Sequence, residues 1–435
     1  MSLEVLIWIA LAVLLVMGTP IFVSLGMASI TVLLLSDIPL SLVMIDLIKV
    51  SDMFPLLAVV GFVFAGALME RGGMAAQIVE VASMLVGHIR GGLGIVTILG
   101  CMFFASMIGS GPGTVAAMGS IMIPSMIKRG YSPEYAAGVS ATGGTLGILI
   151  PPSIMLVFMG SAANVSVGQL FYGAIVPGLL LGAAYIVYIK IVAVVKKDYA
   201  PPMPAEQLAR YSRKQVIWGV IVNVLPVALV IFSVLGAIWL GWCPATEAAA
   251  LGVLASFLIA LLTHSINAQV IKKTLIESIK LTSMVYAVSA FGNLFVTVFM
   301  RLGCSNAVTN LFVHLPLGKW GLFALMMAVV FLLGFLMDWI AVCMITIPIF
   351  VPIATAAGFD ACYFLTMMAI IMQTAFLSPP MAASIFYFQG VAKDRITTAE
   401  TIHGIWPFMA LQVLVFVLCI LFPQIVTWLP GHMIG

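Results

Sequence analysis

Long stretches without any charged side chain are the feature that most limits what this chain can fold into. No Asp, Glu, Lys or Arg occurs in 91–127, 135–189, 215–246, 339–359 or 361–392. A membrane-spanning helix needs about 20 apolar residues. Only 8% of all residues are charged, whereas about 25% are charged in a soluble domain. The sequence therefore predicts an all-α membrane protein with roughly 10 to 12 membrane segments, half-spans included.

The start of the chain and its overall charge narrow the class further. Residues 1–36 have no basic n-region, and their apolar run is too long for a secretory signal peptide, which indicates an uncleaved leading helix. The formal net charge of +3 gives no reason to expect a nucleic-acid partner. The segment 196–214 has more basic than acidic residues, so the positive-inside rule places it in the cytoplasm.

The two halves of the chain repeat each other at an offset of 228 residues. The matching positions are Pro124 with Pro352, Gly130 with Gly358, and Pro151-Pro152 with Pro379-Pro380. These matches predict two related halves, 37–195 and 267–430, joined by a cytoplasmic linker and connecting helices at 196–266. If each half crosses the bilayer an odd number of times, the second half is inverted, as in many secondary transporters.

Each half contains two segments that interrupt its apolar runs. They are SMIGSGPGT (106–114) and TGGTLGILIPPS (142–153) in the first half, and FLMDW (335–339) and QTAFLSPP (373–380) in the second. Proline cannot donate a backbone hydrogen bond and glycine tolerates non-helical angles, so we expect the chain to unwind in these segments. In the first half the expected unwound part is Gly143–Gly147.

The helices beside the first interruption are short. The apolar arms at about 94–107 and 113–127 reach about 21 Å each, whereas the hydrocarbon core is about 30 Å thick. This geometry favours re-entrant hairpins, each followed by a broken helix. The expected elements are hairpins at about 94–127 and about 321–357, and broken helices at about 135–162 and about 361–392.

Interrupted helices expose backbone groups that must find partners inside the protein or bind an ion. Oxygen atoms are the ligands of hard cations, so we expect two or more Na⁺ sites, each at a hairpin tip and the break that follows it. The expected ligands in the first half are Ser106, Gly109, Ser110, Gly111, Thr114, Thr142, Gly143, Gly144, Thr145 and Gly147. Those in the second half are Asp338, Gln373, Thr374 and Ser378.

Asp338 strengthens the second site. It is the only charged residue between Trp320 and Phe359, and it aligns with Ser110 in the repeat. An ionisable residue at membrane depth is rare unless it is functional or paired. Substrate is expected between the two sites, where helix N-termini can face an anionic group. The expected substrate-binding residues are Pro151, Pro152, Ser153, Asn164, Pro379 and Pro380.

Simpler interpretations remain open for several of these residues. The glycines of GSGPG (109–113) could serve close packing between helices. Asp338 could pair with a distant Arg or Lys. Asn164 could end its segment rather than face substrate. Arg71 and Arg301 fit snorkelling at segment ends better than substrate binding.

The run SGPGTVAAMGSIMIPSMIKRGYSPEYAAGVSATGGTLGILIPPSIMLVFMG (110–160) resembles the DctM-like large membrane subunit of tripartite ATP-independent periplasmic (TRAP) transporters. QTAFLSPPMAASIFYFQGVA (373–392) is similar to the corresponding second-half segment. The resemblance, which spans nearly the whole chain, implies a Na⁺-driven, elevator-type transporter in the bacterial inner membrane. It also implies a small four-helix membrane subunit (DctQ-like), a periplasmic binding protein, and an organic acid substrate such as sialic acid or a C4-dicarboxylate.

The family's cation-binding elements map onto 106–114 with 142–147, and onto Asp338 with 373–378. Gly113 departs from the small Ala or Ser expected in the family, which leaves only backbone ligation there. The alternative is a sodium-coupled carboxylate transporter that works without a binding protein. An intramembrane protease needs paired aspartates, and Asp338 has no acidic companion at membrane depth. Two occluding hairpins suit alternating access better than a channel, and no GxxxxGK[ST] loop suggests direct ATP use.

Overall fold

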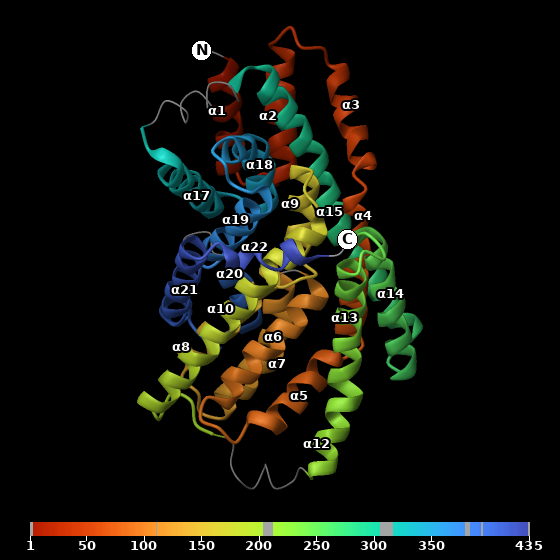
Figure 1. Ribbon diagram of the computed structural model, residues 1–435, viewed down its shortest axis with the longest axis vertical. Coiled ribbons are helices and arrows are strands. Elements are labelled where there is room, and N and C mark those ends of the chain that lie inside the picture. Colours follow the sequence, from red (N-terminus) through yellow and green to blue (C-terminus); the bar gives the residue numbers. More distant parts are fainter. Residues whose placement is uncertain are drawn as a thin grey trace.

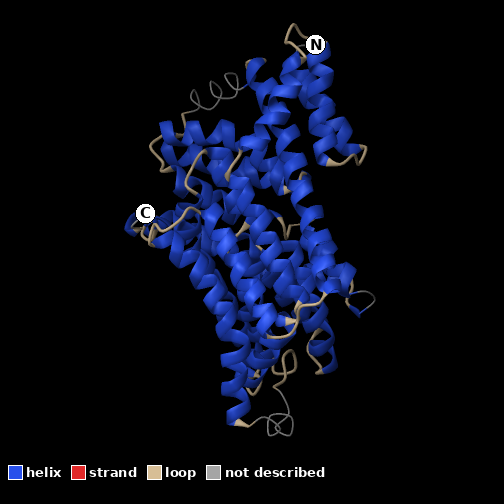
Figure 2. Ribbon diagram, turned by 90° about the vertical axis from the view of Figure 1, so that its right-hand side faces the viewer, coloured by secondary structure: helices blue, strands red, loops and turns tan. Residues whose placement is uncertain are grey.

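A computed structural model describes residues 3–109, 111–202, 212–304, 316–378, 383–392 and 395–433. Within these ranges the regular secondary structure is helical and includes no strand, which confirms the predicted all-α class (Figure 2). The molecule is elongated, with the N-terminus near one end and α12 (Arg213–Gly219) near the other (Figure 1).

Seven helices in the described ranges are long and apolar enough to cross a membrane. The count rises to eight if Ser41–Asp52 and Pro55–Arg71, which meet at a bend of 58°, form one span. Shorter apolar helices of 10–17 residues accompany them. The chain is an integral membrane protein, as predicted.

One set of helices forms a frame against which the rest of the chain packs. It comprises α1 (Leu3–Val16), α2 (Ile21–Leu34), α3 (Ser41–Lys49), α4 (Pro55–Arg71), α5 (Met74–Val86), α12, α13 (Leu225–Trp239), α14 (Ala245–Leu262) and α15 (Ala268–Arg301). Helix α15 packs against α2, α3 and α4, and α4 packs in turn against α14. The frame thus joins helices from the N-terminal part and the middle of the sequence.

Two groups of four helices with matching boundaries lie beside this frame. They are α6 (Gly92–Ile108), α7 (Gly111–Lys128), α8 (Pro133–Leu149) and α9 (Ile154–Ala163), and α17 (Gly318–Leu336), α18 (Trp339–Ala356), α19 (Ala361–Ala375) and α20 (Ala383–Ala392). The end of α6 at Ile108 recurs 228 residues later at Leu336, and the start of α8 at Pro133 recurs at Ala361. The sequence repeat is therefore also a repeat of helix ends.

The two groups enter the molecule from opposite ends. Helices α6 and α7 pack against each other in the lower half of Figure 1, and α17 and α18 pack against each other in the upper half. Each group is followed by a long helix, α10 (Val167–Val195) after the first and α21 (Thr398–Leu421) after the second, and the short α22 (Gln424–Thr427) packs on α10. Opposed hairpins are the arrangement expected of inverted repeats.

Local sequence fixes several helix starts in these groups. Asp338 and Asp360 are the N-caps of α18 and α19, and each side chain accepts a hydrogen bond from a backbone N–H of the first turn. Pro133 occupies the first turn of α8, where its missing N–H removes no helical hydrogen bond. These residues therefore fix the starts of α8, α18 and α19.

Helix α8 does not unwind where the sequence predicted. It runs without interruption through Gly143–Gly147 and ends at Leu149, and residues 150–153 separate it from α9. The break contains Pro151 and Pro152, which cannot donate the backbone hydrogen bonds that would continue the helix. The prediction of an unwound Gly143–Gly147 is wrong, because the prolines end this helix and the glycines do not.

The glycines of α8 instead allow neighbouring helices to approach closely. A Cβ on Gly144 would lie 2.2 Å from Cγ2 of Val115 on α7. A Cβ on Gly143 would lie 2.9 Å from Sγ of Cys101 on α6. Close packing through small residues is common between membrane helices, so α8 is held directly against both arms of the first hairpin.

The arms of the first hairpin are longer than predicted. Helices α6 and α7 contain 17 and 18 residues, which corresponds to roughly 26 and 27 Å at about 1.5 Å per residue. Helix α6 begins at Gly92 and reaches Ile108, and α7 begins at Gly111, so the second arm includes the last three residues of the GSGPG segment.

Candidate ion and substrate site

The tip of the first hairpin meets the break between α8 and α9. Gly109 has a φ of 63°, a left-handed conformation that glycine adopts without steric cost. Its carbonyl oxygen accepts a hydrogen bond of 3.1 Å from the backbone N–H of Ile154, the first residue of α9. A Cβ on Gly109 would lie 3.0 Å from the carbonyl oxygen of Pro152. The sequence predicted this meeting of tip and break.

A cavity of about 110 Å³ lies where the two hairpin tips face each other. Gly109 and Gly111 line it from the first tip, and Asp338 and Trp339 line it from the second. The helix breaks also reach it, through Ile154 and other residues next to the two interruptions. Segments far apart in the sequence thus enclose one small central space.

Asp338 is the one charged side chain among the described residues that line this cavity. Its Oδ2 accepts a hydrogen bond of 3.2 Å from the N–H of Ile340, and the residue is half-buried. The carboxylate is therefore held at the start of α18 and keeps further lone pairs for another partner.

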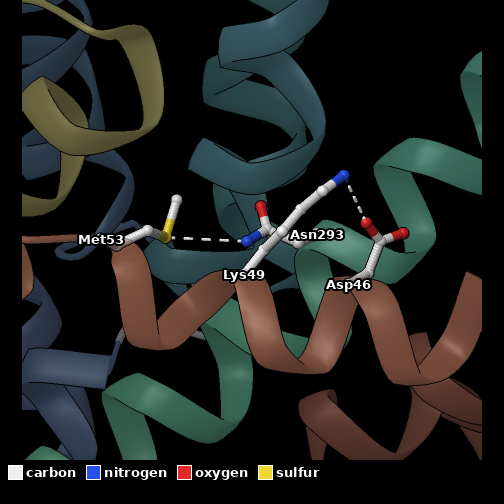
Figure 3. Close-up of polar contacts among 4 residues, drawn as sticks. All are labelled: Asp46, Lys49, Met53 and Asn293. Atoms are coloured by element: carbon white, nitrogen blue, oxygen red, sulfur yellow. Dashed lines mark hydrogen bonds and ion pairs between the residues drawn. The ribbon is translucent and has the colours of Figure 1, made fainter.

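The described residues form two ion pairs, and neither includes Asp338. Lys49 pairs with Asp46 within α3 at 2.8 Å (Figure 3). Nearby, at the bend between α3 and α4, Nδ2 of Asn293 contacts Sδ of Met53. The second pair, also at 2.8 Å, joins Arg71 of α4 to Glu277 of α15. Within the described ranges, Asp338 therefore forms no ion pair with a distant Arg or Lys.

Several predicted hydroxyl ligands share one orientation, in which the proton points to a carbonyl of the same segment. Such a hydroxyl keeps its oxygen lone pairs for a cation. The bonds are Ser106 to Phe103 (2.7 Å), Thr142 to Gly138 (2.5 Å), Thr374 to Ile370 (3.3 Å) and Ser378 to Thr374 (2.9 Å). Ser153, which was predicted to bind substrate, donates in the same way to Ile148 (2.6 Å).

Not every predicted residue lies at the central cavity. Ser106 lines a second, smaller space of about 20 Å³ together with Pro152, between the first hairpin and the frame. Asn164 is exposed and ends α9 with a φ of 53°, so its position matches the simpler of the two interpretations. The remaining predicted cation ligands of the first half are buried inside the helices: Thr114, Thr142, Gly143, Gly144, Thr145 and Gly147.

Three of the predicted positions cannot be placed. Ser110, Pro379 and Pro380 lie outside the described residues. Pro151 lies in the first break, next to residues that line the central cavity.

The sequence missed the wall of the cavity that the frame supplies. Val63 of α4 and Leu281, Met284 and Val285 of α15 line it, as does Tyr387 of α20. The apolar side chains on the frame helices resemble those on any lipid-facing or buried helix. No local pattern distinguishes them, and only the tertiary contact of α15 with α18 places them at the site.

Opposed helical hairpins whose tips meet broken helices around one cavity define a membrane transport protein of the inverted-repeat type. A similar fold is found in the crystal structure of the YdaH transporter of Alcanivorax borkumensis. The TM-score is 0.64, with 87% of this chain and 88% of that chain covered and 12% sequence identity.

Residues 8–425 match the family "Tripartite ATP-independent periplasmic transporter, DctM component", and the chain belongs to this family. The C4-dicarboxylate TRAP transporter large permease protein DctM of Pseudomonas aeruginosa is 35% identical, with 94% of each chain covered. The sialic acid TRAP transporter large permease protein SiaM of Vibrio cholerae is 28% identical, with 88% of each chain covered. The resemblance stated from the sequence is confirmed.

Membership of this family settles the class of activity. Its members are transporter permeases and not enzymes. They work with a small membrane subunit and a periplasmic binding protein, so the chain is one part of a three-component transporter.

Proposed function

We propose that this protein imports an organic acid by Na⁺-coupled secondary transport, after a periplasmic binding protein has delivered the acid to it. A small four-helix subunit is the proposed partner within the membrane. The observation that carries the proposal is the cavity between the two hairpin tips, with Asp338 in its wall. Opposed tips around one central space are suited to alternating access from the two sides of a membrane.

The chemistry of the tips supports a hard monovalent cation. Asp338 provides one carboxylate at the second tip, and Gly109 and Gly111 bring the backbone of the first tip to the same cavity. In the described residues no group of three His, Cys, Asp or Glu side chains could hold a metal ion. Oxygen ligands with one negative charge fit Na⁺. Each Na⁺ that enters down a potential of 100 mV supplies about 2.3 kcal/mol.

The proposed substrate is an anion, although no basic side chain occurs among the described residues that line the cavity. Helices α7, α9 and α18 begin at this cavity, and the partial positive charge of a helix N-terminus favours an anionic group. Bound cations would add their positive charge to that of the helix N-termini. The names of the relatives, which mention C4-dicarboxylates and sialic acid, support small organic acids as the class of substrate.

An elevator-type motion is the proposed route across the membrane. The two hairpins and broken helices would move as one body against the frame. Helices α4 and α15 of the frame complete the wall of the cavity. A sliding body would therefore carry the cavity away from these side chains and open it to the other side.

Reconstituted uptake tests this function. The permease, its small membrane subunit and the binding protein encoded beside it would be studied in proteoliposomes, with radiolabelled C4-dicarboxylates and sialic acid. We expect uptake of one of these acids only when the binding protein is present and an inward Na⁺ gradient is applied. Equal uptake with a K⁺ gradient would contradict Na⁺ coupling. Full uptake without any binding protein would support the stand-alone alternative.

A further inference from the structure

We propose that Thr145 and Gln373 are positioning residues that couple the two ion-binding halves of the transporter. The inference rests on the proposed Na⁺-coupled function. Nε2 of Gln373 on α19 donates a hydrogen bond of 3.1 Å to Oγ1 of Thr145 on α8. The two residues are 228 positions apart, which is the offset of the internal repeat. The contact therefore joins equivalent positions of the two halves and lies on their pseudo-two-fold axis.

The hydroxyl of Thr145 has no capacity left for a cation. It donates to the carbonyl oxygen of Thr142 at 2.8 Å and accepts from Gln373. It also accepts from Nε2 of Gln412 on α21 at 3.5 Å. A hydroxyl has one proton and two lone pairs, and all three are used here. Thr145 thus links α8, α19 and α21, a role that replaces its predicted function as a cation ligand.

Burial makes this junction costly to maintain. The side chains of Thr145, Gln373 and Gln412 are all fully buried, and none of them lines the central cavity. Oε1 of Gln373 and Oε1 of Gln412 have no hydrogen-bond partner among the described residues. Apolar side chains would fill this space without leaving polar atoms unpaired. The amides are therefore better explained by their bond to Thr145 than by packing.

The position of the contact explains how it acts on the site. Thr145 lies one helical turn before Ile148, and Gln373 lies one turn before Phe376. Ile148 and Phe376 both line the central cavity, on opposite halves. If ion binding at the first tip shifts α8, the hydrogen bond transmits that shift to α19. If ion binding at the second tip shifts α19, the same bond transmits the shift to α8. Such a link gives the two sites a reciprocal coupling free energy.

The test compares the Na⁺ dependence of uptake by variants in the reconstituted three-component system. Thr145→Val removes the hydroxyl and keeps the shape, whereas Thr145→Ser keeps the hydroxyl. We expect Thr145→Val and Gln373→Leu to lower the Hill coefficient for Na⁺ toward 1 and to raise the half-saturating Na⁺ concentration several-fold. Thr145→Ser should retain the wild-type Hill coefficient, and the KM for substrate at saturating Na⁺ should change less than about twofold in every variant.

Gln389 offers a matched control. Its Nε2 donates to Oγ1 of Thr401 at 2.8 Å, so Gln389→Leu removes the same kind of hydrogen bond away from the pseudo-two-fold axis. This variant should show the wild-type Na⁺ curve. If Gln389→Leu lowered the Hill coefficient as much as Gln373→Leu, the effect would be a general loss of packing and the inference would be wrong.

An exchange of the two side chains gives a rescue test. Because the positions are equivalent, Thr145→Gln combined with Gln373→Thr restores a Gln–Thr contact with its donor on the other half. Cooperativity should return in the double variant and be absent from both single ones. Unchanged Na⁺ cooperativity in Thr145→Val would refute the inference alone. A wild type without any Na⁺ dependence would refute the proposed function and the inference with it.

Discussion

Asp338 performs a structural task and faces the proposed site at the same time. One carboxylate oxygen caps α18 through the N–H of Ile340, and the residue lines the central cavity. Asparagine caps helices about as well as aspartate. Asp338→Asn should therefore leave folding and assembly intact. It should raise the half-saturating Na⁺ concentration about tenfold or more, because a hydrogen bond or contact to a charged group contributes about 1.5–3 kcal/mol. Initial rates of uptake against Na⁺ concentration would measure this.

Asp360 provides the control for this substitution. It caps α19 through a hydrogen bond of 2.8 Å from the N–H of Tyr363, and its side chain is exposed outside the cavity. Asp360→Asn should change neither the thermal stability nor the Na⁺ dependence. If Asp338→Asn behaved in the same way, Asp338 would be a helix cap without a role in ion binding.

Substitutions of Gly144 test the close packing of α8 on the first hairpin. In Gly144→Ala the new Cβ would lie 2.2 Å from Cγ2 of Val115 and 2.8 Å from its Cα. A backbone atom cannot move away by a rotamer change, so we expect a loss of about 1–3 kcal/mol in stability, as for other overpacked sites. Gly144→Leu should abolish uptake. Gly236→Ala in α13, with no atom within 4 Å of the new Cβ, should be neutral or slightly stabilising. Melting temperatures in detergent would compare the variants.

The sequence predicted the places where helices are interrupted more accurately than the contacts between one helix and another. Proline and glycine end a helix locally, and an isolated aspartate stands out in an apolar run. The interruptions near Gly109 and Asp338 could therefore be recognised from the local sequence alone. The contact of Thr145 with Gln373 depends on how two helices cross, and the repeat offset of 228 residues was its only trace in the sequence. Gly143 and Gly144 were misread because an unwound glycine and a packed glycine have the same local sequence.

Helices α4 and α15 are joined by an ion pair as well as by packing. Arg71 and Glu277 are 42% and 32% exposed, so water screens their attraction and such a pair contributes about 0–1 kcal/mol. Arg71→Gln should therefore lower the melting temperature by only a few degrees, and the exchange Arg71→Glu with Glu277→Arg should recover part of that loss. A variant that failed to assemble would show that Arg71 has a larger role than surface pairing.

For the whole molecule, the proposed elevator motion requires the hairpin body to slide past the frame. Helix α18 of the second hairpin packs against α15 of the frame. A Cβ on Gly292 of α15 would lie 3.2 Å from Cβ of Met344 on α18. This is close to the Cβ–Cβ distance of roughly 3.5–4.5 Å found in disulfides. Cysteines at these two positions, in a background without the native cysteines, should cross-link on oxidation and stop uptake. Reduction with dithiothreitol should restore it.

A cross-link inside the moving body separates the effect of sliding from that of oxidation. In Gly143→Cys the new Cβ would lie 2.9 Å from Sγ and 3.3 Å from Cβ of the native Cys101, so a disulfide would join α8 to α6. Both helices belong to the same proposed body, and the bond relieves the short approach to Cys101. Uptake by this oxidised variant should stay near that of its reduced form. If the α15–α18 cross-link left uptake intact, the hairpin body would not slide past the frame during transport. If both cross-links blocked uptake equally, the block would be an effect of oxidation and not evidence for sliding.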